Sequence, residues 1–179
     1  MQARAGFEVV FFTLRADGLR AEGHVTAVED ERAWAVSYEI ELDDRWRTRS
    51  AVVRSVSELG RREVTIEADG AGSWRADGAP VGQVEGCLDV DLEASAFTNA
   101  LPVNRIGLDT GAEADAPAAY VRAPDLRIER LEQHYARLPD RDGGARFAYG
   151  SPAFGFAAEL AYDQAGLVGD YPGIAVRVG

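Results

Sequence analysis

The chain has 179 residues and a formal net charge of −11, and all 19 of its basic residues are arginine. This acidic balance disfavours binding to nucleic acid or to an anionic membrane surface. The absence of lysine excludes Schiff-base chemistry and a lysine-containing phosphate loop. One cysteine and two histidines exclude an intrachain disulfide, a multi-cysteine zinc site and a three-histidine site, and we expect neither a cofactor nor a metal.

Apolar and polar residues alternate along most of the chain, which is the pattern of strands with one buried face. The clearest run is 33–42, and Asp-Gly pairs and other turn residues separate the runs at short spacing. In chain order, strands are expected near 7–15, 20–28, 32–42, 47–55, 62–69, 72–76, 85–91, 118–122, 126–137, 145–150, 154–162, 166–170 and 174–178.

Two segments need separate treatment. Residues 93–117 hold two prolines with two glycines between them, which predicts a long irregular connection of a length that is often functional. In 126–138, Leu131, Tyr135 and Leu138 are spaced for a helix face, whereas the start of the segment alternates like a strand. We favour one long strand, because the surrounding sequence is β and helix propensity is a weak guide.

These patterns predict an all-β protein with a single domain over 1–179. The expected architecture is a single antiparallel, strongly bent sheet or half-open barrel of about 11–13 short strands. No run approaches the ~20 apolar residues that span a bilayer, so we expect no stable membrane insertion. A single cysteine fits a reducing compartment, and we expect the protein to be cytoplasmic.

The segment 86–92 carries the most unusual pattern. Within a strand, Asp89 and Asp91 share one face. Such carboxylates could form an acid–base pair or bind a hard cation. Aspartates at a strand-to-loop junction also bind backbone N–H groups or arginines. Arg47, Arg49 and Arg105 are the candidate partners, which predicts an Asp–Arg network under the long connection.

A second candidate site follows an Asp-Asp turn. Trp46 lies beside Arg47 and Arg49, so that an aromatic ring could stack on a sugar while the arginines bind a phosphate or sulfate. The alternative is a strand edge with solvated arginines.

Four further polar residues complete the set of candidate ligand contacts. Thr98 and Asn99 are turn formers that could also contact a ligand. Gln133 and Tyr135 alternate onto one strand face and could line a pocket with their polar tips.

The run 86–92, with 97–99 and 101–105, resembles the bacterial family called putative glycolipid-binding, once a domain of unknown function. Residues 46–49, Gln133-x-Tyr135 and 170–173 resemble further landmarks of that family in the same order. The resemblance implies an antiparallel sheet bent around an interior, similar to the carriers of bacterial lipoproteins. The small residues at 94–96 and the non-aromatic 174–175 depart from the expected family pattern.

Three functional hypotheses follow. We favour a non-catalytic protein that binds an amphipathic small molecule, a lipid or glycolipid, in the concave face of the sheet. The candidate binding residues are Trp46, Arg47, Arg49, Asp89, Asp91, Thr98, Asn99, Arg105, Gln133 and Tyr135. The alternatives are a structural or protein-interaction domain without a ligand, with a homodimer as one expected state, and a glycoside-acting enzyme that needs both aspartates in one accessible cleft. A solidly packed interior would weaken the first hypothesis.

Overall fold

The computed structural model describes residues 5–141 and 143–178. It is mostly β, with 58% of residues in strands and 9% in helices, which confirms the all-β prediction. In chain order the elements, with short 3-10 helices labelled η, are β1 (Ala5–Arg15), β2 (Gly18–Glu29), β3 (Arg32–Asp43), β4 (Thr48–Ser57), β5 (Gly60–Ala68), β6 (Trp74–Ala76), β7 (Ala79–Pro80), η1 (Gly82–Val84), β8 (Asp89–Leu92), η2 (Phe97–Asn99), α1 (Ala100–Ile106), β9 (Glu113–Asp115), β10 (Ala118–Val121), β11 (Ile128–Leu131), β12 (His134–Arg141), β13 (Gly144–Ser151), η3 (Pro152–Phe154) and β14 (Phe156–Tyr162).

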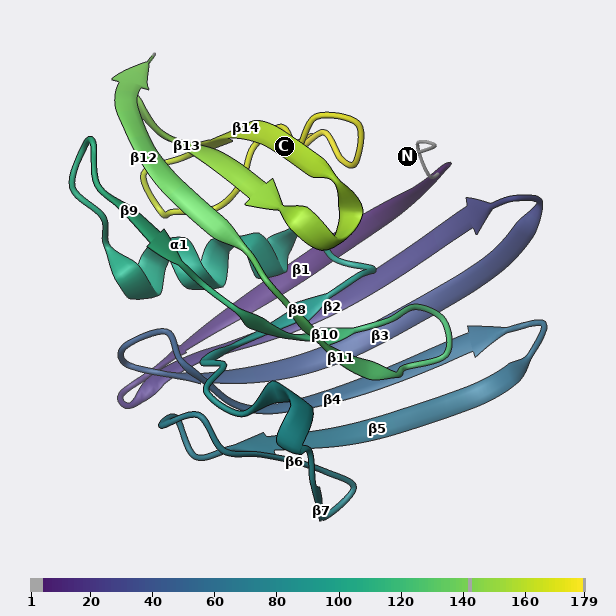
Figure 1. Ribbon diagram of the computed structural model, residues 1–179. Helices are drawn as coiled ribbons and strands as arrows, with labels where there is room; N and C mark the ends of the chain where they lie inside the picture. The colour runs from purple at the N-terminus through teal and green to yellow at the C-terminus, as the bar shows by residue number, and fades with distance from the viewer. Residues whose placement is uncertain (1–4, 142, 179) are drawn as a thin grey trace.

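The strands form one large sheet and two smaller ones (Figure 1). β1 to β7 make a seven-stranded antiparallel sheet in sequence order. The second sheet has the order β11-β10-β8, with β8 parallel to β10, and the third has the order β14-β13-β12-β9. Among the described strands, every other pair is antiparallel, and the sheets do not close into a barrel.

The two smaller sheets are joined by one interrupted ladder. β10 pairs with β11 and β9 pairs with β12 in the same register, which places Gln133 opposite Ala116. Ala116 N donates to the carbonyl of Gln133 at 2.8 Å. Pro117, the next residue, has no N–H to donate, which explains the interruption. The long strand expected over 126–137 is therefore two collinear strands, and no helix forms there.

The connection 93–117 is more regular than the sequence indicated. It contains η2, α1 and β9. Pro102 is compatible with α1 because it lies in the first turn, where a missing N–H leaves no intrahelical bond unmade. Gly107 ends the helix with φ 60° in the left-handed region, a conformation that glycine adopts without strain.

The expected strands at the C-terminal end are wrong. Residues 166–170 and 174–178 form only isolated bridges, Tyr162 to Val168 and Tyr171 to Ala175. These segments instead cover the third sheet, and Val168 and Tyr171 are buried in its apolar cluster. The assignment of 1–179 to a single domain stays a prediction.

The inner face of the large sheet is filled by the chain itself. Tyr38, Ile40 and Val53 from this face pack in one cluster with Val90 of β8 and Leu101 of α1. Two hollows among the described residues have volumes of ≈ 500 and ≈ 200 Å³. The larger is lined by residues from β5 to η1, and the smaller by the turns after β2 and β4 with Pro124. Each hollow borders a buried tryptophan of this cluster, Trp34 at the smaller and Trp74 at the larger, and neither is lined by a candidate binding residue named from the sequence. No helix in the part of the chain that the structure describes is long and apolar enough to cross a membrane.

A glycine makes room for a fully buried tyrosine ring on this face. Gly23 lies opposite Tyr38 in the β2–β3 ladder, and the Tyr38 side chain is 1% exposed. A Cβ at Gly23 would lie 2.0 Å from Tyr38 Cζ. The ring therefore lies directly over the glycine, and its hydroxyl donates to Glu8 at 2.8 Å.

We predict that Gly23→Ala lowers the free energy of unfolding in urea by about 2–3 kcal/mol, because the added methyl must displace a packed ring. The control is Gly150→Ala, a strand glycine whose added Cβ would meet nothing within 4 Å. Equal losses for the two variants would contradict this account.

Candidate ligand-binding site

Asp89 and Arg105 form a two-pronged ion pair at the centre of the molecule. Arg105 Nε donates to Asp89 Oδ1 at 2.8 Å, and the guanidinium NH2 group donates to Oδ2 at 2.6 Å. Asp89 is the first residue of β8 and is 1% exposed, and Arg105 lies in the last turn of α1. Burial raises the pKa of Asp89, and the contacts with Arg105 oppose that rise. The pair holds α1 against β8.

Asp91 is held by two neutral donors. Thr98 Oγ1 donates to its Oδ1 at 2.8 Å, and Gln133 Nε2 donates to its Oδ2 at 2.5 Å. Gln133 Nε2 also donates to the Tyr149 hydroxyl at 3.1 Å. Burial raises the pKa of Asp91 to about 6, against the effect of these hydrogen bonds. Gln133 reaches Asp91 from the interruption between β11 and β12.

Asn99 connects the same centre to the third sheet. The Tyr135 hydroxyl donates to Asn99 Oδ1 at 3.2 Å, and the Tyr162 hydroxyl donates to the Asn99 carbonyl at 3.2 Å. Tyr135 lies on the same buried face as Gln133, as the alternation predicted. Seven of the candidate residues thus lie in one region, which we call the central polar cluster. They are Asp89, Asp91, Thr98, Asn99, Arg105, Gln133 and Tyr135.

Trp46, Arg47 and Arg49 lie outside that cluster. Arg47 Nε donates to Asp43 Oδ2 at 2.9 Å, and its NH1 group donates to the Gly70 carbonyl at 3.0 Å. Arg49 is 3.9 Å from the same Asp43 oxygen. Trp46 takes φ 62° in this turn and packs against the core. The expectation that Arg47 and Arg49 hold the central aspartates is therefore wrong, because the turn supplies a nearer carboxylate.

Sequence reasoning missed three residues that tie the cluster to its surroundings. Thr48 Oγ1 accepts from the Val90 backbone N–H at 2.9 Å, which fixes β8 to β4. The Tyr149 and Tyr162 hydroxyls contact Gln133 and Asn99. The alternation in 145–150 and 154–162 placed both tyrosines on strands, but it could not show which polar groups they meet.

The two carboxylates of the central polar cluster are buried. Asp89 and Asp91 are 1% and 7% exposed, and each carboxylate already has partners on both oxygens. The two hollows described above lie elsewhere. No group of three metal-ligating side chains gathers in 5–141 or 143–178. The arrangement holds elements together, and the binding roles assigned to its residues from the sequence stay predictions.

A different surface is open to solvent: the outer face of the large sheet at β1. Phe7, Val9 and Phe11 alternate onto this face, and their exposed fractions are 58%, 37% and 63%. We call these three residues the apolar row. An exposed apolar patch on an otherwise charged surface is typical of a binding surface.

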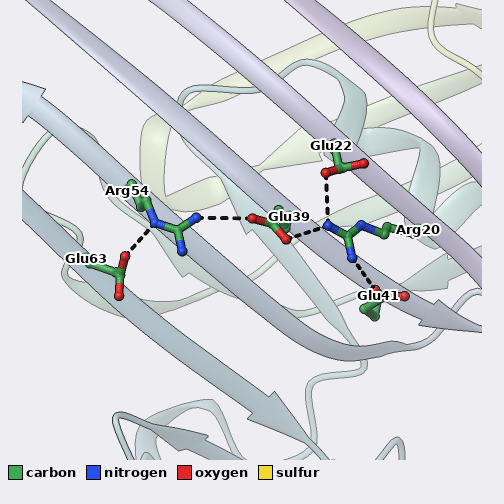
Figure 2. A network of polar contacts seen from close by, with 6 residues as sticks. All are labelled: Arg20, Glu22, Glu39, Glu41, Arg54 and Glu63. Atoms are coloured by element: carbon green, nitrogen blue, oxygen red, sulfur yellow. Dashed lines mark hydrogen bonds and ion pairs between the residues drawn. The ribbon is translucent and has the colours of Figure 1, made fainter.

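A network of charged side chains extends over the outer face of β2 to β5 (Figure 2). Arg20 contacts Glu22 at 2.9 Å, Glu39 at 2.6 Å and Glu41 at 3.5 Å. Arg54 contacts Glu39 at 3.2 Å, which continues the network across β4. We call this set, with Glu63, the Arg–Glu network.

The row and the network lie on neighbouring strands of the same face. Phe11 pairs with Glu22 across β1 and β2, and Glu22 pairs with Glu39 across β2 and β3. This face is therefore amphipathic, with an apolar edge and a hydrogen-bonding centre.

A family model described as putative glycolipid-binding matches residues 1–177. The chain belongs to this family. A crystal structure at 1.80 Å of a DUF1089 family protein from Pseudomonas aeruginosa is similar in sequence and fold, with 34% identity and a TM-score of 0.86. The match covers 97% of this chain and 92% of that chain. Among curated proteins, none matches this chain. Membership of the glycolipid-binding family, expected from the central motif, is thus confirmed.

We predict that Arg105→Met lowers the free energy of unfolding by about 3 kcal/mol, because it leaves the Asp89 carboxylate buried without its charged partner. The control is Arg127→Ala, which removes a solvent-exposed pair with Asp125 and should cost less than about 1 kcal/mol. Urea denaturation of both variants measures the difference, and similar losses would argue against a dominant Asp89–Arg105 pair.

The raised pKa of Asp91 predicts a pH-dependent stability. The folded protein favours the neutral form of this carboxyl. The stabilisation that the protonated Asp91 gives is therefore fully present below the ordinary aspartate pKa of 3.8, and it is lost as the pH rises through about 6. Relative to the wild type, Asp91→Asn should therefore gain about 2–3 kcal/mol of unfolding free energy between pH 4 and pH 7.

The control for this measurement is Glu159→Gln. The hydrogen bond from Arg146 lowers the pKa of Glu159. The stabilisation from the charged Glu159 is therefore present above the ordinary glutamate pKa and is lost as the pH falls. The stability difference of this variant should change with pH in the opposite direction. Parallel pH profiles for Asp91→Asn and the wild type would refute the prediction.

Proposed function

We propose that the protein is a non-catalytic binder of a lipid or glycolipid, and that the ligand lies on the outer face of the large sheet. The observation that carries this proposal is that the exposed apolar row and the Arg–Glu network lie side by side on one face of the sheet. The family name supports the ligand class. The packed inner face argues against the concave site expected from the sequence.

The chemistry of the face suits an amphipathic molecule. An acyl chain laid along Phe7, Val9 and Phe11 would remove apolar area from water, which is favourable by roughly 25 cal/mol per Å². Sugar hydroxyls both donate and accept hydrogen bonds, and the network offers carboxylates that accept and guanidinium groups that donate.

A non-catalytic role is supported by the central carboxylates. Asp89 and Asp91 are buried and bonded, whereas a glycoside-acting pair needs an accessible cleft. The net charge of −11 favours single lipid molecules over an anionic bilayer as the ligand. Three expectations stay predictions: the likeness to lipoprotein carriers, the cytoplasmic location and the homodimer. The open edge of β1 offers a surface for such a dimer.

The proposal predicts binding of n-dodecyl maltoside below its critical micelle concentration, detected by native mass spectrometry and calorimetry. Phe7→Ser should weaken binding about fivefold to tenfold, because it removes part of the apolar contact, or about 1 kcal/mol. Leu59→Ser is the matched control, since Leu59 is 64% exposed but lies in the β4–β5 turn.

The headgroup contact is tested with Arg54→Ala. This variant should weaken binding of dodecyl maltoside more than binding of dodecylphosphocholine, which has the same chain and no sugar hydroxyls. Absence of binding by the wild type, or equal losses in the Phe7 and Leu59 variants, would overturn the proposal.

A further inference from the structure

We propose that β1 pairs in antiparallel fashion with β1 of a second copy of this chain, which joins two seven-stranded sheets into one. The inference names the partner for the open edge of the sheet. It stands independently of the proposed ligand, because it rests on the backbone of β1 and on its charge.

The first observation is the free backbone of β1. All eleven residues pair with β2 on one side. Beyond that ladder, no backbone group of β1 bonds to another backbone group in the described residues. Every second residue of an antiparallel strand directs its N–H and C=O away from its partner, so a row of such groups about 35 Å long faces outward.

The second observation is that this edge has no protection, whereas the opposite edge of the same sheet has. β7 is two residues long and ends in Pro80, a short strand with a proline, as is typical of a protected edge. β1 has no proline, and its one carboxylate does not face outward. Glu8 accepts hydrogen bonds from the Ser95 hydroxyl at 2.5 Å and from the Ala96 N–H at 3.0 Å. Its carboxylate therefore lies on the inner side of the sheet and places no charge on the open edge.

The third observation is charge. β1 contains one acidic residue, Glu8, and one basic residue, Arg15, which lies at its end. Two copies of a chain with net charge −11 repel each other over most of their surface, and a strand with no net charge is where that repulsion is smallest. A strongly charged partner would find no complementary charge here.

Self-pairing also suits the side chains. Antiparallel pairing about a two-fold axis brings the same patch of both copies together. The apolar rows would then form cross-strand pairs of aromatic and β-branched residues, which stabilise sheets. Hydrocarbon cannot replace this partner, because it offers nothing to the outward N–H and C=O groups.

The size of the contact sets the expected affinity. A strip about 35 Å long and about 10 Å wide buries roughly 350 Å² on each copy, against about 800 Å² in a standard interface. The main-chain ladder adds about ten hydrogen bonds. We therefore expect a weak dimer that dissociates in the micromolar range.

Sedimentation equilibrium of the full chain without lipid, from 1 μM to 1 mM, tests the inference. The mass should rise with concentration from 19.3 kDa toward twice that value. Phe11→Glu should weaken the dimer at least tenfold, because it places like charges on neighbouring strands. Leu59→Glu is the control, since Phe11 and Leu59 are 63% and 64% exposed. A mass of 19.3 kDa at every concentration, or equal effects of the two variants, would overturn the inference.

Single cysteine variants locate the contact. With Val9→Cys, Phe11→Cys and Thr13→Cys, the position nearest the two-fold axis should cross-link to itself under oxidation, and Leu59→Cys should not. The natural Cys87 is buried and should not interfere. Cross-linking through Leu59→Cys alone would reject β1 as the interface. Dodecyl maltoside binding measured at 1 μM protein reports on the ligand separately, so either result can fail without the other.

Discussion

The short strand β8 carries two buried carboxylates, and the surrounding elements supply their partners. A buried charge without a partner costs several kcal/mol, so each aspartate constrains what lies next to it. Arg105 fixes the end of α1, and Thr98 and Gln133 bring η2 and the interrupted ladder to Asp91. The large sheet joins through Thr48, which accepts from the β8 backbone. Sequence-distant segments thus meet at one polar centre.

The packing around this centre underlies the choice of the outer face as the proposed ligand site. Its polar groups satisfy one another, and the apolar residues around them fill the inner face of the large sheet. A bent sheet with a hollow interior would bind a ligand in its concave face. In this protein, core side chains pack against that face. The exposed apolar residues of β1 and its open edge are the features on which the two proposals rest.

Several parts of the central polar cluster could be predicted from sequence. The pairing of Asp89 with Arg105 followed from chemistry, because a buried carboxylate needs a partner and arginine was the one basic residue type present. The shared face of Gln133 and Tyr135 followed from period-two alternation. The same reasoning failed for Arg47, because an aspartate four residues earlier satisfies it locally.

By itself, the sequence determined most strands of the large sheet and the excluded chemistries, because alternation, turn residues and composition are local properties. The family was indicated by the resemblance of the motifs around 86–105. The tertiary structure decided that α1 forms within 93–117, that 166–178 adds no strand, and that the concave face is filled. Those outcomes depend on contacts between residues far apart in the chain, which no local pattern encodes. The exposure of the apolar residues of β1 is of the same kind, because it depends on β1 being the edge strand of the sheet.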